Sequence, residues 1–220
     1  MLQILFEDNY LLALYKPAGL SSESGTDRHP SAETWAQEYL LAQREQRNGK
    51  TPHYKPPFVR AAHRLDRPTS GVLLFAKTKA ALSHLMAQFE ARSVEKIYRA
   101  ITEQVPEPAS ATLRHWLKRA PDGRSALVFD LEAANTQPCS LQYTVLEKIG
   151  AGARLEIRPE TGRFHQIRAQ LAHAGWPIVG DVQYGGQAWL PNQLQLHARR
   201  LSFLHPKSGE EMVLEAKEPW

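Results

Sequence analysis

The chain has 220 residues, 42% hydrophobic and 23% charged, a composition typical of a soluble globular protein with one sizeable domain or two small ones. The net charge of +4 and the pI of about 9.2 are compatible with a polyanionic partner but do not require one. Cys139 is the only cysteine, which excludes an internal disulfide, and Glu7 and Asp8 interrupt the first apolar stretch, which argues against a signal peptide or a membrane span, so we expect a cytoplasmic protein.

In chain order, the first elements are a hairpin, a helix and a basic segment. Short apolar runs at residues 2–6 and 11–15 flank a polar turn and predict two paired strands. Residues 31–43 predict a helix, which Ser31 can cap. Residues 44–60 contain three prolines and five lysines or arginines, and we interpret them as a basic loop or insertion.

The rest of the chain is dominated by strands. Val72–Ala76 predicts a buried strand, Thr78–Glu90 an amphipathic helix, and Val94–Thr102 an alternating strand. Further strands are expected near 111–117, 126–131, 140–147, 153–158, 194–203 and 212–216, and a further helix over 163–174. Strands that mostly follow one another, with three good helices, predict an α+β fold. We expect a mixed, largely antiparallel sheet flanked by helices, in one domain over residues 1–220.

The stretch AAHRLDRPTSGVLLFAK, residues 61–77, places Asp66 among several cations directly before an apolar run. Asp-Arg-Pro-Thr-Ser-Gly also has the composition of a turn, so the local sequence alone favours a structural role. That role leaves the cations unexplained. A carboxylate near cations stays ionised and only accepts hydrogen bonds, which suits a nucleophile or a general base and not a general acid.

A second polar cluster lies in RPETGRFHQIRAQLAHAGWPIVGDVQYGG, residues 158–186. On the expected helix, His165 and Arg168 share a face beside the core-facing one. Arg168 is either a surface arginine that contributes little or an arginine directed at a carboxylate or a phosphate. The Thr161-Gly162-Arg163 entry to this helix also offers backbone amides to a phosphate, although any helix start does so.

Tyr98, in EKIYRAI, is the third candidate. A tyrosine on an alternating strand most often packs on the sheet. Beside Lys96 on the same face, it could instead present its ring and hydroxyl to a flipped base. No HExxH, GxSxG or phosphate-loop motif occurs, and nothing in the sequence implies a metal or an organic cofactor.

Five motifs together resemble an RluA-type pseudouridine synthase. They are ILFEDNYLLALYKPAGL, HRLDRPTSGVLLFAK, EKIYRA, TGRFHQIRAQLAHAGWPIVGDVQYGG and LHARRLSFLHP, in this order. The resemblance covers almost the whole chain except about residues 24–60 and 103–140. It implies an isomerase that detaches uracil at N1–C1′ in RNA, turns it and reattaches it through C5. Such a reaction needs no cofactor, because the oxidation state is unchanged.

The resemblance also assigns roles to residues. It implies that Asp66 is the essential carboxylate, that Arg168 pairs with it and that Tyr98 stacks on the flipped base. Whether Asp66 adds to the base, attacks C1′ or promotes a glycal intermediate stays open. The further residues that we assign to RNA binding or to the walls of the site are His63, Arg64, Arg67, Lys96, Arg163, His165 and Leu196. Among these, His63 and Arg64 match the pair that supports the flipped nucleotide and the Asp66 loop, and Leu196 matches an apolar residue of the floor.

The chain departs from the common family pattern at two places. Arg67-Pro68 stands where Lys-Asp is commonest, and Phe164 where Thr is commonest, which bears on subfamily and substrate. The N-terminal S4 domain of many members is not expected, so RNA affinity should come from the catalytic domain itself. The candidates are residues 44–60, the Arg114–Arg124 region and Arg199 with Arg200, each of which is as consistent with a solvated charged face. We expect a monomer.

Three classes of function remain open. The first is an RNA pseudouridine synthase acting on transfer or ribosomal RNA, and HRLDRPTSGVLL is more similar to members that act on transfer RNA. The second is a non-catalytic RNA-binding protein or chaperone, against which the intact set of Asp66, Tyr98 and Arg168 argues. The third is a glycosidic hydrolase, which normally needs two carboxylates. The only rival to Asp66 is Asp181, which we interpret as a turn residue.

Overall fold

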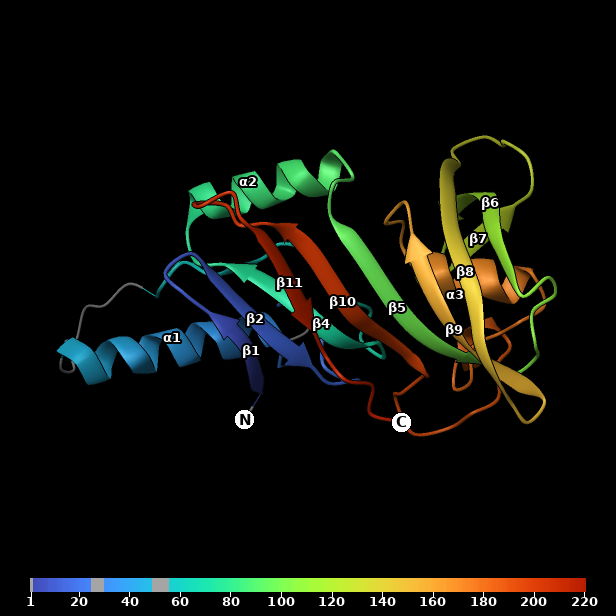
Figure 1. Cartoon of the computed structure of the whole chain (residues 1–220), viewed down its shortest axis with the longest axis horizontal. Helices are drawn as coiled ribbons and strands as arrows, with labels where there is room; N and C mark the ends of the chain where they lie inside the picture. Colours follow the sequence, from blue (N-terminus) through green and yellow to red (C-terminus); the bar gives the residue numbers. More distant parts are fainter. Residues whose placement is uncertain (1, 25–29, 49–55) are drawn as a thin grey trace. The chain divides into compact units, whose positions relative to one another are not determined.

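The computed structural model describes residues 2–24, 30–48 and 56–220. The chain forms two compact units, one of Met1–Val94 with Arg200–Lys217 and one of Glu95–Arg199 with Glu218–Trp220 (Figure 1). The single domain expected over 1–220 stays a prediction. Strand β10 (Leu196–Leu204) belongs partly to each unit, which are described separately below. No helix among the described residues is long and apolar enough to span a membrane.

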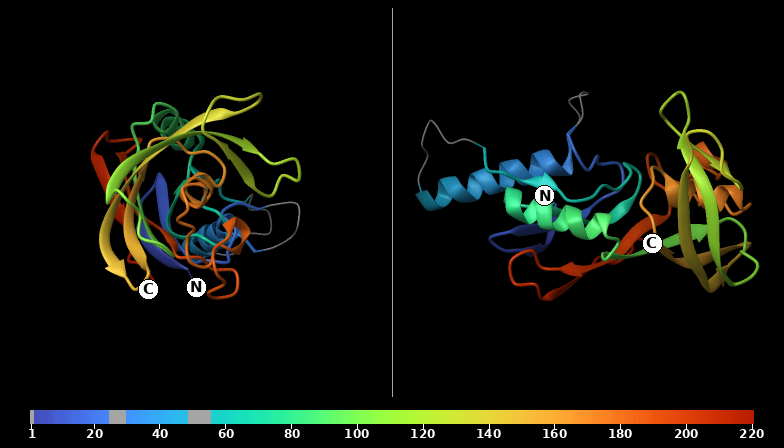
Figure 2. Two further views of the ribbon diagram at one scale, coloured as in Figure 1. Left: turned by 90° about the vertical axis from the view of Figure 1, so that its right-hand side faces the viewer. Right: turned by 90° about the horizontal axis from the view of Figure 1, so that it is seen from above.

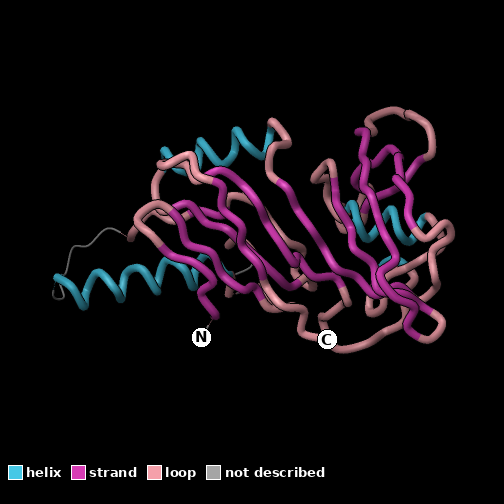
Figure 3. The backbone as a smooth tube through the Cα atoms, viewed as in Figure 1, coloured by secondary structure: helices cyan, strands magenta, loops and turns pink. Residues whose placement is uncertain are grey.

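The first unit is a sheet with two helices beside it (Figure 3). Its strands are β1 (Gln3–Glu7), β2 (Leu11–Lys16), β3 (Arg60–Ala61), β4 (Ser70–Ala76), the end of β10 and β11 (Glu211–Glu215). Their order is β1-β2-β4-β10-β11, with β3 on β4. The pairs β1–β2, β2–β4, β3–β4 and β10–β11 are antiparallel. The helices are α1 (Ala32–Asn48) and α2 (Lys79–Glu90).

Every residue of β4 is buried, as its continuous apolar sequence predicts for a central strand. Leu74 of β4, Leu11 of β2 and Leu85 of α2 belong to one hydrophobic core. The side chain of Thr78 accepts a hydrogen bond from the backbone of Ala81 and so caps α2 at its first turn. The segment that follows Asp66 is therefore fixed by the core of the first unit.

The second unit contains β5 (Glu95–Thr102), β6 (Ser110–Arg119), β7 (Ala126–Phe129), β8 (Gln137–Ile149) and β9 (Gly152–Pro159). Their order is β5-β9-β8-β6-β7, with antiparallel neighbours throughout. The strands curve around helix α3 (Gln166–His173), as the left view of Figure 2 shows. Leu155 and Ile157 of β9 and Leu171 of α3 form its core, and the short 3₁₀ helix η1 (Val182–Tyr184) follows α3.

The structure confirms the expected α+β fold and the N-terminal hairpin, but two boundaries were wrong. Helix α1 extends to Asn48, so the expected basic loop over 44–60 begins as helix, and its residues 49–55 lie outside the described part. Helix α3 begins at Gln166, not at Arg163, because His165 has a φ of 53°, which a right-handed helix cannot accommodate.

We expect Leu85→Ala to lower the free energy of unfolding by about 2–5 kcal/mol, because it leaves a cavity in the core of the first unit. Its neighbour on α2 is a matched control: Met86 is 57% exposed, whereas Leu85 is 0% exposed. Met86→Ala should change stability by no more than about 0.5 kcal/mol. Urea unfolding of both variants measures the difference, and equal effects would contradict the packing of α2 on β4.

Candidate active site

Asp66 lies between two residues whose backbones are both fastened to the segment after β2. On its N-terminal side, the amide of Leu65 donates to Ser22 Oγ at 3.0 Å. Ser22 Oγ in turn donates to the carbonyl of Leu65 at 2.8 Å, and both residues are buried. One hydroxyl thus satisfies both backbone groups of the residue before Asp66, which fixes the direction of the chain there.

The C-terminal side of Asp66 is fastened by Gly19. The amide of Gly19 donates to the Arg67 carbonyl at 2.8 Å, and Arg67 Nε donates to the Gly19 carbonyl at 3.0 Å. Gly19 has a φ of 86°, a left-handed conformation that glycine adopts without steric cost. The amide of Thr69 donates to the Asp66 carbonyl at 3.0 Å and closes the turn that the sequence predicts. The half-buried Asp66 therefore sits on a backbone that is held from both sides.

A buried ammonium group lies beneath this loop. Lys16, the last residue of β2, is 0% exposed. Its Nζ donates to the carbonyls of Pro17 at 3.0 Å, Leu20 at 2.8 Å and Arg67 at 3.2 Å. Burial lowers the pKa of Lys16 to about 7, and the negative charge of Asp66 acts in the opposite direction. The three acceptors match the three N–H donors of the charged form.

The sequence analysis did not identify Lys16 as part of the site, because a lysine at the end of a strand is usually exposed. The only local signal is a lysine that directly follows a run of buried residues. Of the cations that the sequence places around Asp66, Arg64 and Arg67 are exposed, and Arg64 lies 3.7 Å from Glu23. His63 is half-buried: its Nε2 accepts from the amide of Leu74 at 3.2 Å. His63 is thus tied to β4, in keeping with a supporting role for the loop.

In the second unit, Tyr98 is half-buried on β5 and packs against the core that contains Leu196, which is 3% exposed. Its strand partner on β9 is Ile157. Lys96, two residues earlier, donates from Nζ to the carbonyl of Thr161 at 3.4 Å. Tyr98 and Leu196 therefore pack in one core. This is the arrangement expected if Tyr98 supplies the aromatic ring of a site and Leu196 its apolar floor.

Arg168 is 4% exposed on α3 and forms a two-pronged ion pair with Asp181. Its Nε donates to Asp181 Oδ2 at 2.7 Å and its Nη2 to Oδ1 at 2.8 Å, with a further bond from Nη2 to Gln183 Oε1 at 2.9 Å. Asp181 does lie in a turn, but its carboxylate is also the buried partner of Arg168. Such a planar pair fixes the orientation of the guanidinium.

His165 completes the support of Arg168. Its Nε2 lies 3.1 Å from Arg168 Nη1, and its Nδ1 lies 3.0 Å from the hydroxyl of Tyr184. Because arginine only donates, His165 Nε2 accepts this hydrogen bond from Arg168. Phe164 stacks on the His165 ring with centroids 3.8 Å apart. A contact of His165 with RNA stays a prediction.

The backbone amide of Arg163 does not serve as the predicted phosphate site. It donates to Gln166 Oε1 at 3.0 Å, and the same oxygen accepts from the hydroxyl of Thr161 at 2.7 Å. Arg163 Nε lies 3.3 Å from the carbonyl of Pro138. The expectation of available amides was therefore wrong at Arg163, because the side chain of Gln166 folds back to cap this turn.

The family model described as RNA pseudouridylate synthase matches residues 10–173 of this chain. The matched region includes Lys16, Asp66, Tyr98 and Arg168. This chain belongs to the RNA pseudouridylate synthase family. The family isomerises uridine to pseudouridine in RNA. The match therefore confirms the family resemblance that the motifs indicated and the predicted isomerase class.

Curated relatives span the chain almost completely. An uncharacterized RNA pseudouridine synthase of Bacillus subtilis is 35% identical over 99% of this chain and 69% of its own length. A tRNA pseudouridine synthase C of Vibrio cholerae is 34% identical over 98% of this chain and 91% of its own length. A ribosomal large subunit pseudouridine synthase C of the same organism is 32% identical, and the chain spans only 64% of it.

A solved structure shares the fold. The human RNA pseudouridylate synthase domain containing 4 matches with a TM-score of 0.75 and 26% identity, over 98% of this chain and 88% of that one. The α+β fold of this synthase family member is thereby confirmed.

The lowered pKa of Lys16 predicts a pH-dependent stability. Below about pH 7 both the folded and the unfolded chain bind the proton, and the cost of burying the charge is fully present. Above it the folded chain loses the proton, while the unfolded chain keeps it up to about pH 10.5, so the free energy of unfolding rises with pH. The slope is at most about 1.4 kcal/mol per pH unit.

Urea unfolding at pH 6–9 of the wild type and of Lys16→Met tests this prediction. The wild type should gain stability relative to Lys16→Met above pH 7, because methionine has no proton to lose. Lys79→Met, at an exposed position, should follow the wild-type profile. Parallel profiles of the wild type and Lys16→Met would contradict the prediction.

We expect Asp181→Asn to lower the free energy of unfolding by about 3–5 kcal/mol, because it leaves the buried charge of Arg168 without its partner. Glu95→Gln is the matched control: it breaks the exposed pair of Glu95 with Arg158, also in the second unit, and should cost less than about 1 kcal/mol. Thermal unfolding distinguishes the two, and equally small losses would show that the Arg168–Asp181 pair contributes little.

Proposed function

We propose that this chain converts uridine to pseudouridine in RNA with Asp66 as the essential carboxylate and with the target base flipped out of its stack. The observation that carries the proposal is the double fastening of the Asp66 backbone, at Leu65 by Ser22 and at Arg67 by Gly19. A carboxylate held in advance of the reaction loses no free energy to reorganisation in the transition state.

The reaction balances without a cofactor. The N1–C1′ bond breaks and a C5–C1′ bond forms, C5 loses its proton to solvent and N1 gains one. No electrons are exchanged with another molecule. The proton lost at C5 gives the reaction a direct readout.

Tyr98 is proposed to hold the flipped base. Taking a base out of the stack costs a few kcal/mol. Stacking on an aromatic ring returns about 1–3 kcal/mol per base, and Tyr98 is anchored for this purpose by the core around Leu196. The exposed Arg64 and Arg67 flank Asp66 and are proposed to contact the neighbouring phosphates, which orient the nucleotide.

Arg168 is proposed to pair with the Asp66 carboxylate, as the resemblance implies. Its guanidinium is already oriented by Asp181, Gln183 and His165. Arginine suits this role because its planar fork keeps its charge and its direction at any working pH. Arg168 would thus direct a fixed charge at Asp66 without an entropic cost for ordering its own side chain.

Transfer RNA is the proposed substrate, ahead of ribosomal RNA. The relatives of this chain include a protein named tRNA pseudouridine synthase C, which is 34% identical over 98% of this chain. The HRLDRPTSGVLL motif favours the same substrate class.

The test is tritium release from RNA labelled at uridine C5, with transfer RNA and ribosomal RNA assayed separately. We expect release from transfer RNA by the wild type and none above background by Asp66→Asn. Glu90→Gln, at the exposed end of α2, neutralises a carboxylate elsewhere and should release tritium like the wild type.

Other outcomes would each overturn part of the proposal. Release by Asp66→Asn would show that the carboxylate is dispensable. Binding of both RNAs by the wild type without release from either would favour the non-catalytic RNA-binding protein. Free uracil in place of retained pseudouridine would indicate a hydrolase.

A further inference from the structure

Three side chains that are far apart in the sequence converge in the second unit, and the isomerase mechanism uses none of them. His115 comes from β6, Asp130 follows β7 and His173 ends α3. Asp130 Oδ1 lies 2.8 Å from His173 Nε2 and 3.8 Å from His115 Nε2. The ligand atoms of all three lie within 4.8 Å of one another, and no other such group occurs among residues 2–24, 30–48 and 56–220.

We propose that His115, Asp130 and His173 bind one divalent transition-metal ion of the zinc type. Two imidazole nitrogens and one carboxylate oxygen are a donor set that such ions prefer, whereas Mg²⁺ and Ca²⁺ prefer oxygen alone. Tetrahedral zinc with bonds of 2.0–2.1 Å places its ligand atoms about 3.3 Å apart. The distance of 2.8 Å from Asp130 Oδ1 to His173 Nε2 is shorter than this value, and the distance of 3.8 Å to His115 Nε2 is longer.

The three side chains can reach that geometry with small rotations. Asp130 is 76% exposed and His173 35% exposed, so both can turn without disturbing the core. The rings of His115 and His173 are 5.0 Å apart and inclined at 80°, so they meet edge to face and not in a stack. Both rings direct Nε2 at the same carboxylate oxygen, as two ligands of one ion would. A simple surface ion pair of Asp130 with His173 would not need a second imidazole directed at the same oxygen.

Gln170 orients the least mobile ligand. It is fully buried, and its Nε2 lies 3.0 Å from His115 Nδ1 and donates to the Leu113 carbonyl at 3.2 Å. A histidine that binds metal through one ring nitrogen is usually oriented by a hydrogen bond at the other. Metal at Nε2 moves the His115 proton to Nδ1. The Oε1 of Gln170, which has no hydrogen-bond partner among the described residues, can accept that proton once the amide turns over.

The ion would connect three elements of the second unit. His173 ends the same helix on which Arg168 lies five residues earlier. A metal that joins the last turn of α3 to β6 and to the end of β7 would therefore restrain the helix that positions Arg168. We assign the ion to this stabilising role, which is independent of the isomerase proposal.

The test is a titration of tag-free, dialysed protein with Zn²⁺ by calorimetry and with Co²⁺ by visible absorption. We expect one ion per chain, a Co²⁺ spectrum of a nitrogen- and oxygen-ligated site, and a higher melting temperature with Zn²⁺. Asp130→Asn and His173→Gln should each weaken binding at least about tenfold, because the loss of an outer partner alone costs 10–100-fold. Both positions are exposed, so both variants should fold.

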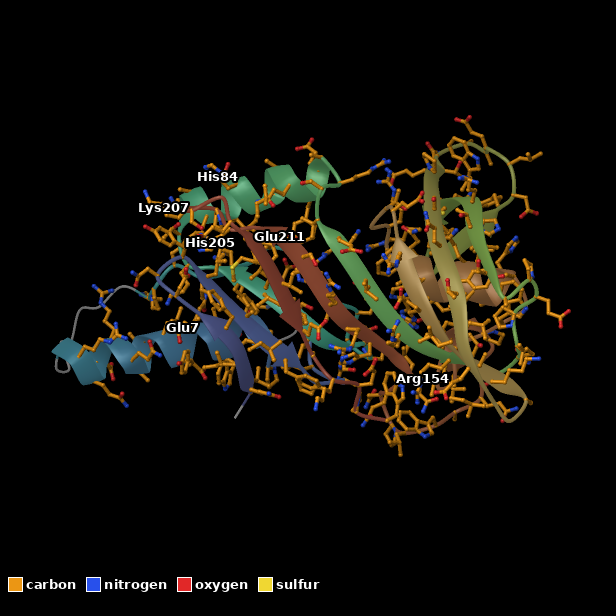
Figure 4. All side chains as sticks on the ribbon, in the orientation of Figure 1. Glu7, His84, Arg154, His205, Lys207 and Glu211 are labelled. Atoms are coloured by element: carbon orange, nitrogen blue, oxygen red, sulfur yellow. The ribbon has the colours of Figure 1, made fainter. Side chains whose placement is uncertain are left out.

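Two controls exclude other sites. His84 is exposed on α2 in the first unit, where Figure 4 labels it, and His84→Gln should bind like the wild type. Cys139→Ser should also bind normally, because burial raises the pKa of this thiol to about 11 and keeps it protonated. Absence of one-to-one binding, or unchanged binding in Asp130→Asn and His173→Gln, would overturn the proposal. Neither result depends on pseudouridine formation.

Discussion

The position of the Asp66 loop depends on the buried ammonium group of Lys16. Three backbone carbonyls, at Pro17, Leu20 and Arg67, converge on its Nζ. Carbonyls that point together repel one another unless a donor lies between them, and an unpaired buried carbonyl costs about 1–3 kcal/mol. The chain therefore needs a hydrogen-bond donor at this point, and the amino group of Lys16 supplies it. The bonds from Ser22 and Gly19 then fix the residues on each side of Asp66.

The second unit also buries a cationic side chain, which is an arginine and not a lysine. Arg168 is as buried as a core residue, and Asp181 balances its charge with two parallel hydrogen bonds. Lysine suits the first site, because a compact ammonium can donate in three directions to carbonyls. Arginine suits the second, because a planar guanidinium matches a carboxylate edge to edge. Exchange of the two residue types would lose the match between donor and acceptor geometry in both units.

Much of the fold follows from local sequence. The alternation around Tyr98, the apolar run of β4 and the Thr78 cap each specify their element without help from distant residues. The start of α3 does not, because the Gln166 side chain takes the Arg163 amide and His165 adopts a left-handed conformation. Neither feature can be inferred from the hydrophobic periodicity of the sequence.

Asp66 could be proposed from the sequence because the neighbouring cations are adjacent in the chain, and its catalytic role stays a prediction. The groups that hold the site in place were not. Lys16 is 51 residues from its acceptor Arg67, and Asp181 is 13 residues from Arg168 across a turn. His115, Asp130 and His173 likewise meet only once β6, β7 and α3 have packed. Pairing between distant residues depends on the folded chain, which a single sequence does not display.

The charges of Lys16 and Asp66 are linked, and this limits what any one substitution at Asp66 can mean. The negative charge of Asp66 raises the pKa of Lys16, against the larger effect of burial. Asp66→Asn removes that charge, so Lys16 would lose its proton at a lower pH than in the wild type. A neutral amine has two N–H groups for three carbonyls, and the loop would then lose one of its hydrogen bonds.

Loss of activity in Asp66→Asn at pH 7 therefore combines the loss of the reacting carboxylate with a less firmly held loop. At pH 6 Lys16 is more fully protonated, and the chemical role of the carboxylate is better separated from its electrostatic support of the loop.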